Sequence, residues 1–269
     1  MKKSFLLVAL IAISAIIPTA CNCKQQANGS NLSTDSLKYE KKTKTAECII
    51  KADYPKDGNP ALANAIEEYI SESLGGTYYG NLSNGDSLLA FYGDAQMKDL
   101  ESTAKELVGS ATPSVYNSNI IKKAYEADGY VTYTATNENF LGGAHGMHSQ
   151  QGVTFRKSDG RRFGQEMLIG TDNDKFHKII KEGLAEYFTK GGEKATTDEE
   201  LKSLLITDND INYLPLPQFA PYLTAEGVTF VYQPYEIAPY AAGMPQFTVS
   251  YDKMKPYLTS TIQKIIAKK

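Results

Sequence analysis

The sequence predicts an α+β protein with two consecutive subdomains of largely antiparallel sheet and packed helices, after a signal peptide and a flexible tether. Asp128-Gly129 and Asp159-Gly160 each separate two strand-like runs, which indicates a β-hairpin because both turn positions favour positive φ. Apolar residues at helical spacing occur before, between and after these hairpins. Hairpin-joined strands that alternate with helices are typical of an α+β fold, not of a doubly wound parallel sheet.

The first subdomain is expected over residues 40–149. A strand at 44–54 is followed by Asn59-Pro60, an N-cap residue and a proline at the first helical position. The helix that starts there has a regular apolar face and ends at Gly75-Gly76. The remaining elements are a second helix and a hairpin, expected from Asp94 and over 119–127 and 130–136.

The second subdomain is expected over residues 150–269 and repeats this logic. Its hairpin is followed by a helix at 174–189 and by a capping box formed by Thr197 and Glu200. Alternating apolar residues then predict two late strands on either side of a Pro- and Gly-containing stretch, and a last helix follows Pro256.

Residues 1–20 have the pattern of a secretory signal, with Lys2 and Lys3 before an apolar run that ends in small residues. The small residues directly before Cys21 resemble a bacterial lipobox, which implies cleavage before Cys21 and acylation of that cysteine. Cleavage without modification is the alternative. Residues 21–39 are expected to be a polar, flexible tether. The protein is therefore expected in the cell envelope as a membrane-anchored lipoprotein. Acids are absent between Cys21 and Thr34, which favours the periplasm-facing side.

Charge and cysteine content exclude several classes of function. With 28 basic and 31 acidic residues the formal net charge is −3, so a nucleic-acid partner is not expected. The three cysteines form no Cys-x-x-Cys pair, which argues against thiol redox chemistry and a thiolate zinc site. Cys23 and Cys48 are either bridged or isolated thiols.

A catalytic constellation is not found, and we expect neither an enzyme nor a cofactor. The sequence has no nucleophile elbow, phosphate-binding loop or dinucleotide fingerprint. His145 and His148 lie three residues apart on a glycine-rich loop with no flanking carboxylate as a third ligand, so no metal site is expected. A side chain that hydrogen-bonds to hold a tight glycine turn is the alternative role for His145.

Two segments carry a family resemblance. The stretch from Phe140 to Gly146 resembles the Gly-Gly-Ala-His signature of the bacterial DUF3298 and DUF4163 families, and the stretch from Tyr232 to Gly243 resembles the Tyr-rich DUF3298 signature. Tyr54-Pro55 before a helix is similar to the start of the DUF4163 part. The resemblance implies an envelope-exposed module similar to the extracellular domain of lysozyme-sensing anti-sigma factors and to the N-terminal module of a peptidoglycan deacetylase. Neither role gives this module a catalytic residue.

The resemblance, joined to a tyrosine-rich second half, predicts a non-catalytic binding module whose partner is a lysozyme-type muramidase or peptidoglycan. Tyrosine offers a large contact area with a polar tip at low entropic cost. A structural or assembly lipoprotein without a soluble ligand is the alternative, and an uncharacterised hydrolase is a third. The candidate binding residues are Gly142, Gly143, His145, Tyr235, Glu236 and Tyr240.

Two structural expectations accompany these candidates. Gly142, Gly143 and Gly146 are expected at backbone conformations that are costly for other residues. At least one of Tyr235 and Tyr240 is expected to be buried.

Overall fold

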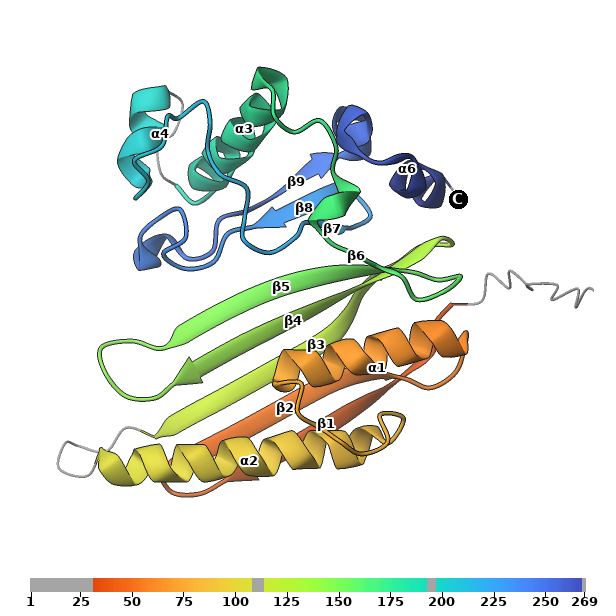
Figure 1. Cartoon of the computed structure of the whole chain (residues 1–269). Coiled ribbons are helices and arrows are strands. Elements are labelled where there is room, and N and C mark those ends of the chain that lie inside the picture. The colour runs from red at the N-terminus through yellow and green to blue at the C-terminus, as the bar shows by residue number, and fades with distance from the viewer. Residues whose placement is uncertain (1–30, 108–113, 193–196, 268–269) are drawn as a thin grey trace, which may run out of the picture.

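A computed structural model describes residues 31–107, 114–192 and 197–267 of the chain. These residues form two lobes, each built on its own sheet (Figure 1). The first lobe has six strands in the order β1-β2-β3-β4-β5-β6, and the second has three in the order β7-β8-β9. All neighbouring strands are antiparallel except β2 and β3. The predicted α+β class is thus confirmed.

The first lobe places two helices on one face of its sheet (Figure 1). Both helices lie between β2 and β3 in the chain, which is the crossover that a parallel strand pair requires. The elements are β1 (Thr34–Lys42), β2 (Ala46–Pro55), α1 (Pro60–Leu74), α2 (Gly85–Glu106), β3 (Val115–Glu126), β4 (Tyr130–Phe140), β5 (Met147–Arg156) and β6 (Arg162–Phe163).

Local signals set the ends of α1 as expected. The Asn59 side chain accepts a hydrogen bond from the Ala61 N–H, Pro60 is the first helical residue, and Gly75 ends the helix at φ 133°. Helix α2 differs from expectation, because it begins at Gly85 and not at Asp94. Its extra first turns are fixed by the Asn84 cap and by burial of apolar residues such as Leu88.

The expected tether at 21–39 is wrong over its last part, because Thr34–Lys42 form β1 and Leu32 is buried. The side chains of β1 are mostly exposed and polar, so composition gives no sign of a strand. What orders this segment is backbone pairing along the whole of β2, from Thr34 opposite Pro55 to Lys42 opposite Glu47. Residues 21–30, with Cys21 and Cys23, lie outside the described residues.

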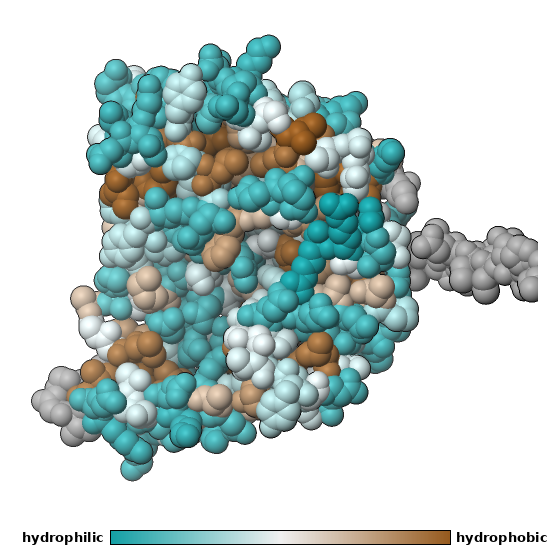
Figure 2. Space-filling model, viewed as in Figure 1, coloured by the Kyte–Doolittle hydropathy of each residue, from teal (hydrophilic) through white to brown (hydrophobic). Residues whose placement is uncertain are grey.

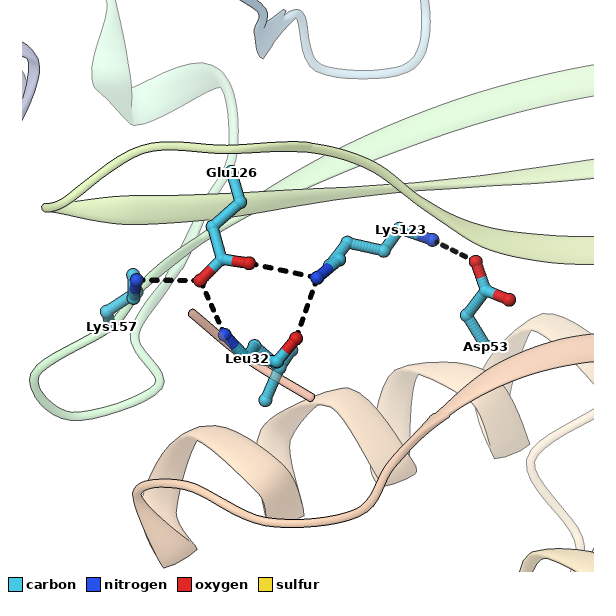
Figure 3. A network of polar contacts seen from close by, with 5 residues as sticks. All are labelled: Leu32, Asp53, Lys123, Glu126 and Lys157. Atoms are coloured by element: carbon cyan, nitrogen blue, oxygen red, sulfur yellow. Dashed lines mark hydrogen bonds and ion pairs between the residues drawn. The ribbon is translucent and has the colours of Figure 1, made fainter. Parts of the chain in front are cut away.

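A largely buried carboxylate, Glu126, holds Leu32 against the end of β3 (Figure 3). Glu126 accepts hydrogen bonds from the Leu32 N–H at 2.7 Å, the Lys157 ammonium at 2.6 Å and the Lys123 ammonium at 3.0 Å. Lys123 also donates to the Leu32 carbonyl, and its backbone N–H donates to Asp53. Burial alone would raise the pKa of Glu126, but the hydrogen bonds from Lys157, Leu32 and Lys123 outweigh it and hold the pKa below its ordinary value.

The second lobe packs its longest helix against its last strand. Gly183 of this helix lies against Phe247, where an added Cβ would come within 2.2 Å of the ring. The capping box at Thr197 and Glu200 is present as predicted. The lobe contains α3 (Asp174–Lys190), α4 (Asp198–Leu204), β7 (Tyr222–Leu223), β8 (Gly227–Val231), β9 (Gln246–Ser250), α5 (Tyr251–Met254) and α6 (Ser260–Ile266), with short 3-10 turns at Gln165–Met167, Tyr240–Ala242 and Lys255–Tyr257.

The lobes join through buried hydroxyl groups. On the face of the first sheet opposite α1 and α2, Thr132 donates to the Leu223 carbonyl at 2.7 Å, and the Leu223 N–H donates to Thr154 at 2.9 Å. The Tyr130 and Tyr251 hydroxyls lie 2.7 Å apart. The division between subdomains therefore falls after Phe163 and not at the expected 149/150 boundary, which lies within β5. Among the described residues no helix is long and apolar enough to cross a membrane.

Candidate functional site

The glycine loop at 141–146 joins β4 to β5. Gly142 and Gly143 have φ of 98° and 96°, in the region that favours glycine, as predicted. Gly146 is outside that region, so the prediction is wrong for its φ. It is constrained by space instead, because an added Cβ would lie 2.6 Å from the Asn139 carbonyl oxygen. Two different causes therefore select glycine within one short loop.

The tyrosine loop between β8 and β9 carries the second motif. Tyr232 at its start is buried and donates to the Pro215 carbonyl at 2.6 Å. Tyr235 has φ 65°, the one positive φ among the described non-glycine residues. This conformation costs about 1–2 kcal/mol in a residue with a Cβ, so the surrounding loop has to hold it in place. Tyr187 of α3 donates to the Ala242 carbonyl and supports the far side of the loop.

The two loops meet at one end of the molecule (Figure 1). The rings of His145, Tyr235 and Tyr240 form an aromatic cluster there with His148 at the start of β5. The His145 ring stacks on Tyr240 with centroids 4.0 Å apart, and Tyr235 lies 5.6 Å from Tyr240. Tyr235 is 50% exposed, Tyr240 is half-buried and His145 is exposed. The expectation that at least one of the two tyrosines is buried is therefore wrong.

Hydrogen bonds fix the polar edges of this aromatic cluster. The Gly146 carbonyl lies 2.8 Å from His145 Nδ1 and accepts from the Tyr240 hydroxyl at 2.6 Å. Because a carbonyl only accepts, Nδ1 carries a proton, and in the neutral ring Nε2 accepts from the Tyr235 hydroxyl at 3.3 Å. His148 Nδ1 lies 3.4 Å from the Tyr240 hydroxyl. His145 thus holds the glycine turn and presents a ring face at the same time.

Glu236 has a supporting position. One carboxylate oxygen accepts from the Gln218 N–H at 2.5 Å, and the other accepts from the Gln233 N–H at 2.6 Å. Both oxygens are used to close the tyrosine loop. The structure therefore brings together Gly142, Gly143, His145, Tyr235 and Tyr240 at one surface, with Glu236 beneath the loop that presents two of them.

Gln233 is a residue that sequence reasoning missed. Its buried side chain accepts from the Gln150 N–H at 3.0 Å and donates to the Gln150 carbonyl at 2.7 Å. The amide thereby closes one position on the outer edge of β5 and ties the tyrosine loop to the first lobe. Its position inside the Tyr-rich motif could have drawn attention to Gln233. Nothing in the local sequence, however, indicates that a glutamine at this position is buried.

Tyr116 of β3 borders the cluster and was also missed. An added Cβ at Gly146 would lie 3.7 Å from its hydroxyl, which donates to Glu138 at 3.2 Å. Burial, and next the nearby Glu138 carboxylate, raise the pKa of Tyr116. Within the described ranges no group of three or more His, Cys, Asp or Glu side chains could hold a metal ion. Cys48 is buried and has no disulfide partner among the described residues, and burial raises its pKa to about 11. Cys23, its possible partner, lies outside them.

Comparisons with known proteins find a family model that matches part of the second lobe and solved structures that are similar in fold. Residues 171–252 match the family model described as a protein of unknown function, DUF3298. A DUF3298 family member from Bacteroides fragilis is similar in structure over 89% of this chain and 100% of that one, with a TM-score of 0.69 and 19% identity. A DUF3298 family protein from Pseudomonas aeruginosa is similar over 87% of this chain and 97% of that one, with a TM-score of 0.61 and 18% identity. No curated protein matches the chain. At such identities the likeness concerns the fold.

Proposed function

We propose that this protein is a lipid-anchored, non-catalytic binding module of the cell envelope, whose partner is a lysozyme-type muramidase or peptidoglycan. The carrying observation is the exposed aromatic cluster, which two motifs about ninety residues apart in the chain assemble at one surface. The DUF3298 match covers the tyrosine motif, and the proposal extends it to a DUF4163-like first lobe.

The chemistry of the cluster favours contact with a protein. Aromatic rings with polar tips provide large contact areas and are enriched among the residues that dominate binding energy. The loop holds the backbone of Tyr235 at a positive φ, and a hydrogen bond holds the His145 ring. Both rings are therefore in place before a partner binds. A preorganised surface loses less conformational entropy on binding.

The cluster lies at one end of the first sheet and Leu32 at the other. Leu32 lies beside Glu126, at the end of β3 that pairs with the start of β4, and the glycine loop follows the other end of β4 (Figures 1 and 3). The 11 residues of β4 separate the two points by roughly 35 Å at the usual rise of a strand.

The proposal is tested by titrating the detergent-solubilised full chain with purified c-type lysozyme and, separately, by co-sedimentation with purified peptidoglycan. Tyr235→Ala and His145→Ala are expected to weaken binding by tenfold or more, which corresponds to about 1.4 kcal/mol or more. Tyr79→Ala is the matched control, because Tyr79 is 89% exposed on the α1–α2 connection, outside the cluster.

Equal loss for the control and the cluster variants would contradict a specific site. Binding of neither lysozyme nor peptidoglycan would reject the binding function and favour a structural or assembly role. Turnover of peptidoglycan by the pure protein would reject the non-catalytic assignment.

A further inference from the structure

A second polar surface lies on the helix-bearing face of the first sheet, where the face changes from apolar to amide side chains. Ile121, Ala135 and Val153 belong to the inner part of this face by strand register. Further along the same strands it consists of carboxamides, which α2 extends with one glutamine. We call this set the amide platform; its members are Gln96, Asn117, Asn119, Asn137, Asn139 and Gln151.

Hydrogen bonds connect five of these amides in a chain that runs from Asn139 on β4 to Gln96 on α2. Asn139 donates to Asn137 at 3.0 Å, and Asn137 donates to both Asn117 and Asn119 at 2.7 and 2.8 Å. Asn117 and Asn119 in turn donate to the Gln96 carbonyl oxygen at 2.9 and 3.1 Å. A connected network of this kind holds its side chains in fixed positions. The network uses both N–H groups of Asn137 and saturates the Gln96 oxygen, which also accepts from Cys48. The amide nitrogen of Gln96 and one donor and one acceptor position on each of Asn117 and Asn139 are left for a ligand.

Gln151 continues the platform to the edge of a groove. Within the part of the chain that the structure describes, its side chain makes no hydrogen bond. A small hollow of about 80 Å³ over the platform and a groove of about 430 Å³ between α1 and the 219–220 segment share Ser73, Gln151 and Phe219 as lining residues. Figure 2 shows this face hollowed between the helices and the second lobe, with hydrophilic side chains around the hollow. Phe219 is 36% exposed there and offers a ring face.

The free edge of β5 beside the groove is too short for a peptide to pair with it as an added strand. Because Gln150 bonds outward to Gln233, strand alternation places the N–H and C=O of Gly152 on the same outer edge. Thr154, the next outward residue, lies opposite Phe163 of β6. Between these two closed positions, where the groove lies, the open edge is thus one residue long. This is too short for an extended peptide to add as a strand, since strand addition requires a run of backbone pairs.

We propose that the amide platform and the adjoining groove bind an uncharged glycan strand that carries acetamido groups. Sugar hydroxyls and acetamido groups both donate and accept, as carboxamides do, and the platform itself carries no charge. The groove is lined by one acid and one base, Glu72 and Arg162, which form an ion pair with each other and so favour an uncharged ligand. The outward N–H and C=O of Gly152 suit a secondary amide, and Phe219 offers a ring to the apolar face of a sugar. This site lies on the helix-bearing face of the first sheet, with Phe219 supplied by the second lobe, and it contains no residue of the aromatic cluster.

The test is a calorimetric titration of the detergent-solubilised full chain with chitotetraose, with cellotetraose as the probe that lacks acetamido groups. Chitotetraose is expected to bind at least tenfold more tightly than cellotetraose. Phe219→Ala and Gln151→Ala are each expected to weaken chitotetraose binding by tenfold or more. Both residues lie at the rim, so an unchanged melting temperature checks that these variants fold. Tyr79→Ala, which lies outside both surfaces, is the control and should bind chitotetraose as the unmodified chain does.

Equal binding of the two oligosaccharides, or no binding of chitotetraose, would overturn the proposal. Binding that Phe219→Ala and Gln151→Ala leave unchanged would also overturn it, as would competition by an unstructured polyalanine-based peptide that displaces chitotetraose. A chain that binds chitotetraose and fails to bind lysozyme would separate this site from the aromatic cluster.

Discussion

Replacing Glu126 with glutamine tests whether one largely buried carboxylate holds the segment beside Leu32 against the first sheet. The side chain is 9% exposed, and it faces the ammonium groups of Lys157 and Lys123, which are 11% and 25% exposed. Glu126→Gln keeps the size but removes the charge and turns one acceptor into a donor that faces a lysine. Removing one partner of a buried ion pair costs about 3–5 kcal/mol, and the partial exposure of Lys123 favours the lower end, about 3 kcal/mol.

The pH dependence has a definite sign. The folded pKa of Glu126 lies below its ordinary value of 4.5, so the carboxylate stabilises the fold above that pH. This contribution is lost as the pH falls through the folded pKa, where the protonated acid resembles glutamine. The difference between the unmodified chain and Glu126→Gln should be largest at neutral pH and should shrink below about 4.5.

The assay is urea unfolding from pH 7 down to pH 3, joined to hydrogen exchange. The Lys56 amide, which donates to the Ser33 carbonyl, should exchange faster in Glu126→Gln because the segment beside Leu32 is released. Glu182→Gln is the control, since its pair with Lys178 is exposed and should change stability by no more than about 0.5 kcal/mol. Equal unfolding midpoints at pH 7, or a difference that persists unchanged in acid, would refute the reasoning.

Three further predictions concern the site, the link between the lobes and the anchor. Gly143→Val should destabilise the protein by about 1–2 kcal/mol through backbone strain alone, because nothing lies within 4 Å of the added Cβ. Ala144→Val is the control and should leave the melting temperature unchanged, so equal melting temperatures for both variants would contradict the strain argument. Gln233→Leu should lower the free energy of unfolding, measured by chemical denaturation, by about 2–4 kcal/mol, since it leaves the Gln150 N–H and C=O unpaired. Gln246→Leu, at an exposed position, should lower it by less than about 1 kcal/mol, and the reverse order would contradict the role of Gln233 in joining the tyrosine loop to the first lobe. Cys21→Ser should release the chain from the membrane fraction, and an intact-mass measurement that finds Cys21 unmodified in the mature protein would remove the anchor.

The aromatic cluster was predictable in its parts and not in its arrangement. The glycine and tyrosine motifs each stand out in the sequence, and His145, Tyr235 and Tyr240 were named from them. Neither motif indicates that the Tyr240 ring stacks on His145, because that contact depends on how the second lobe docks on β5. Glu236 stands in the same motif, but its carboxylate binds backbone N–H groups that only the folded loop brings near.

The sequence by itself determined the fold class, the hairpins and most helix ends, because turn residues, caps and apolar periodicity act between neighbours in the chain. Asn59-Pro60 and the Thr197 capping box each express such a local preference. The hairpin at Asp128-Gly129 also forms, but the predicted cause is wrong, because neither residue has a positive φ; a Cβ added at Gly129 would lie 2.5 Å from the Ile265 carbonyl oxygen. The tertiary structure decided what depends on distant partners. Strand β1 is ordered by pairing with β2 and by Glu126, not by its own polar residues. The amide platform likewise arises from strand register, which sets Asn117, Asn119 and Asn137 side by side although nothing in their local sequence marks them as a surface.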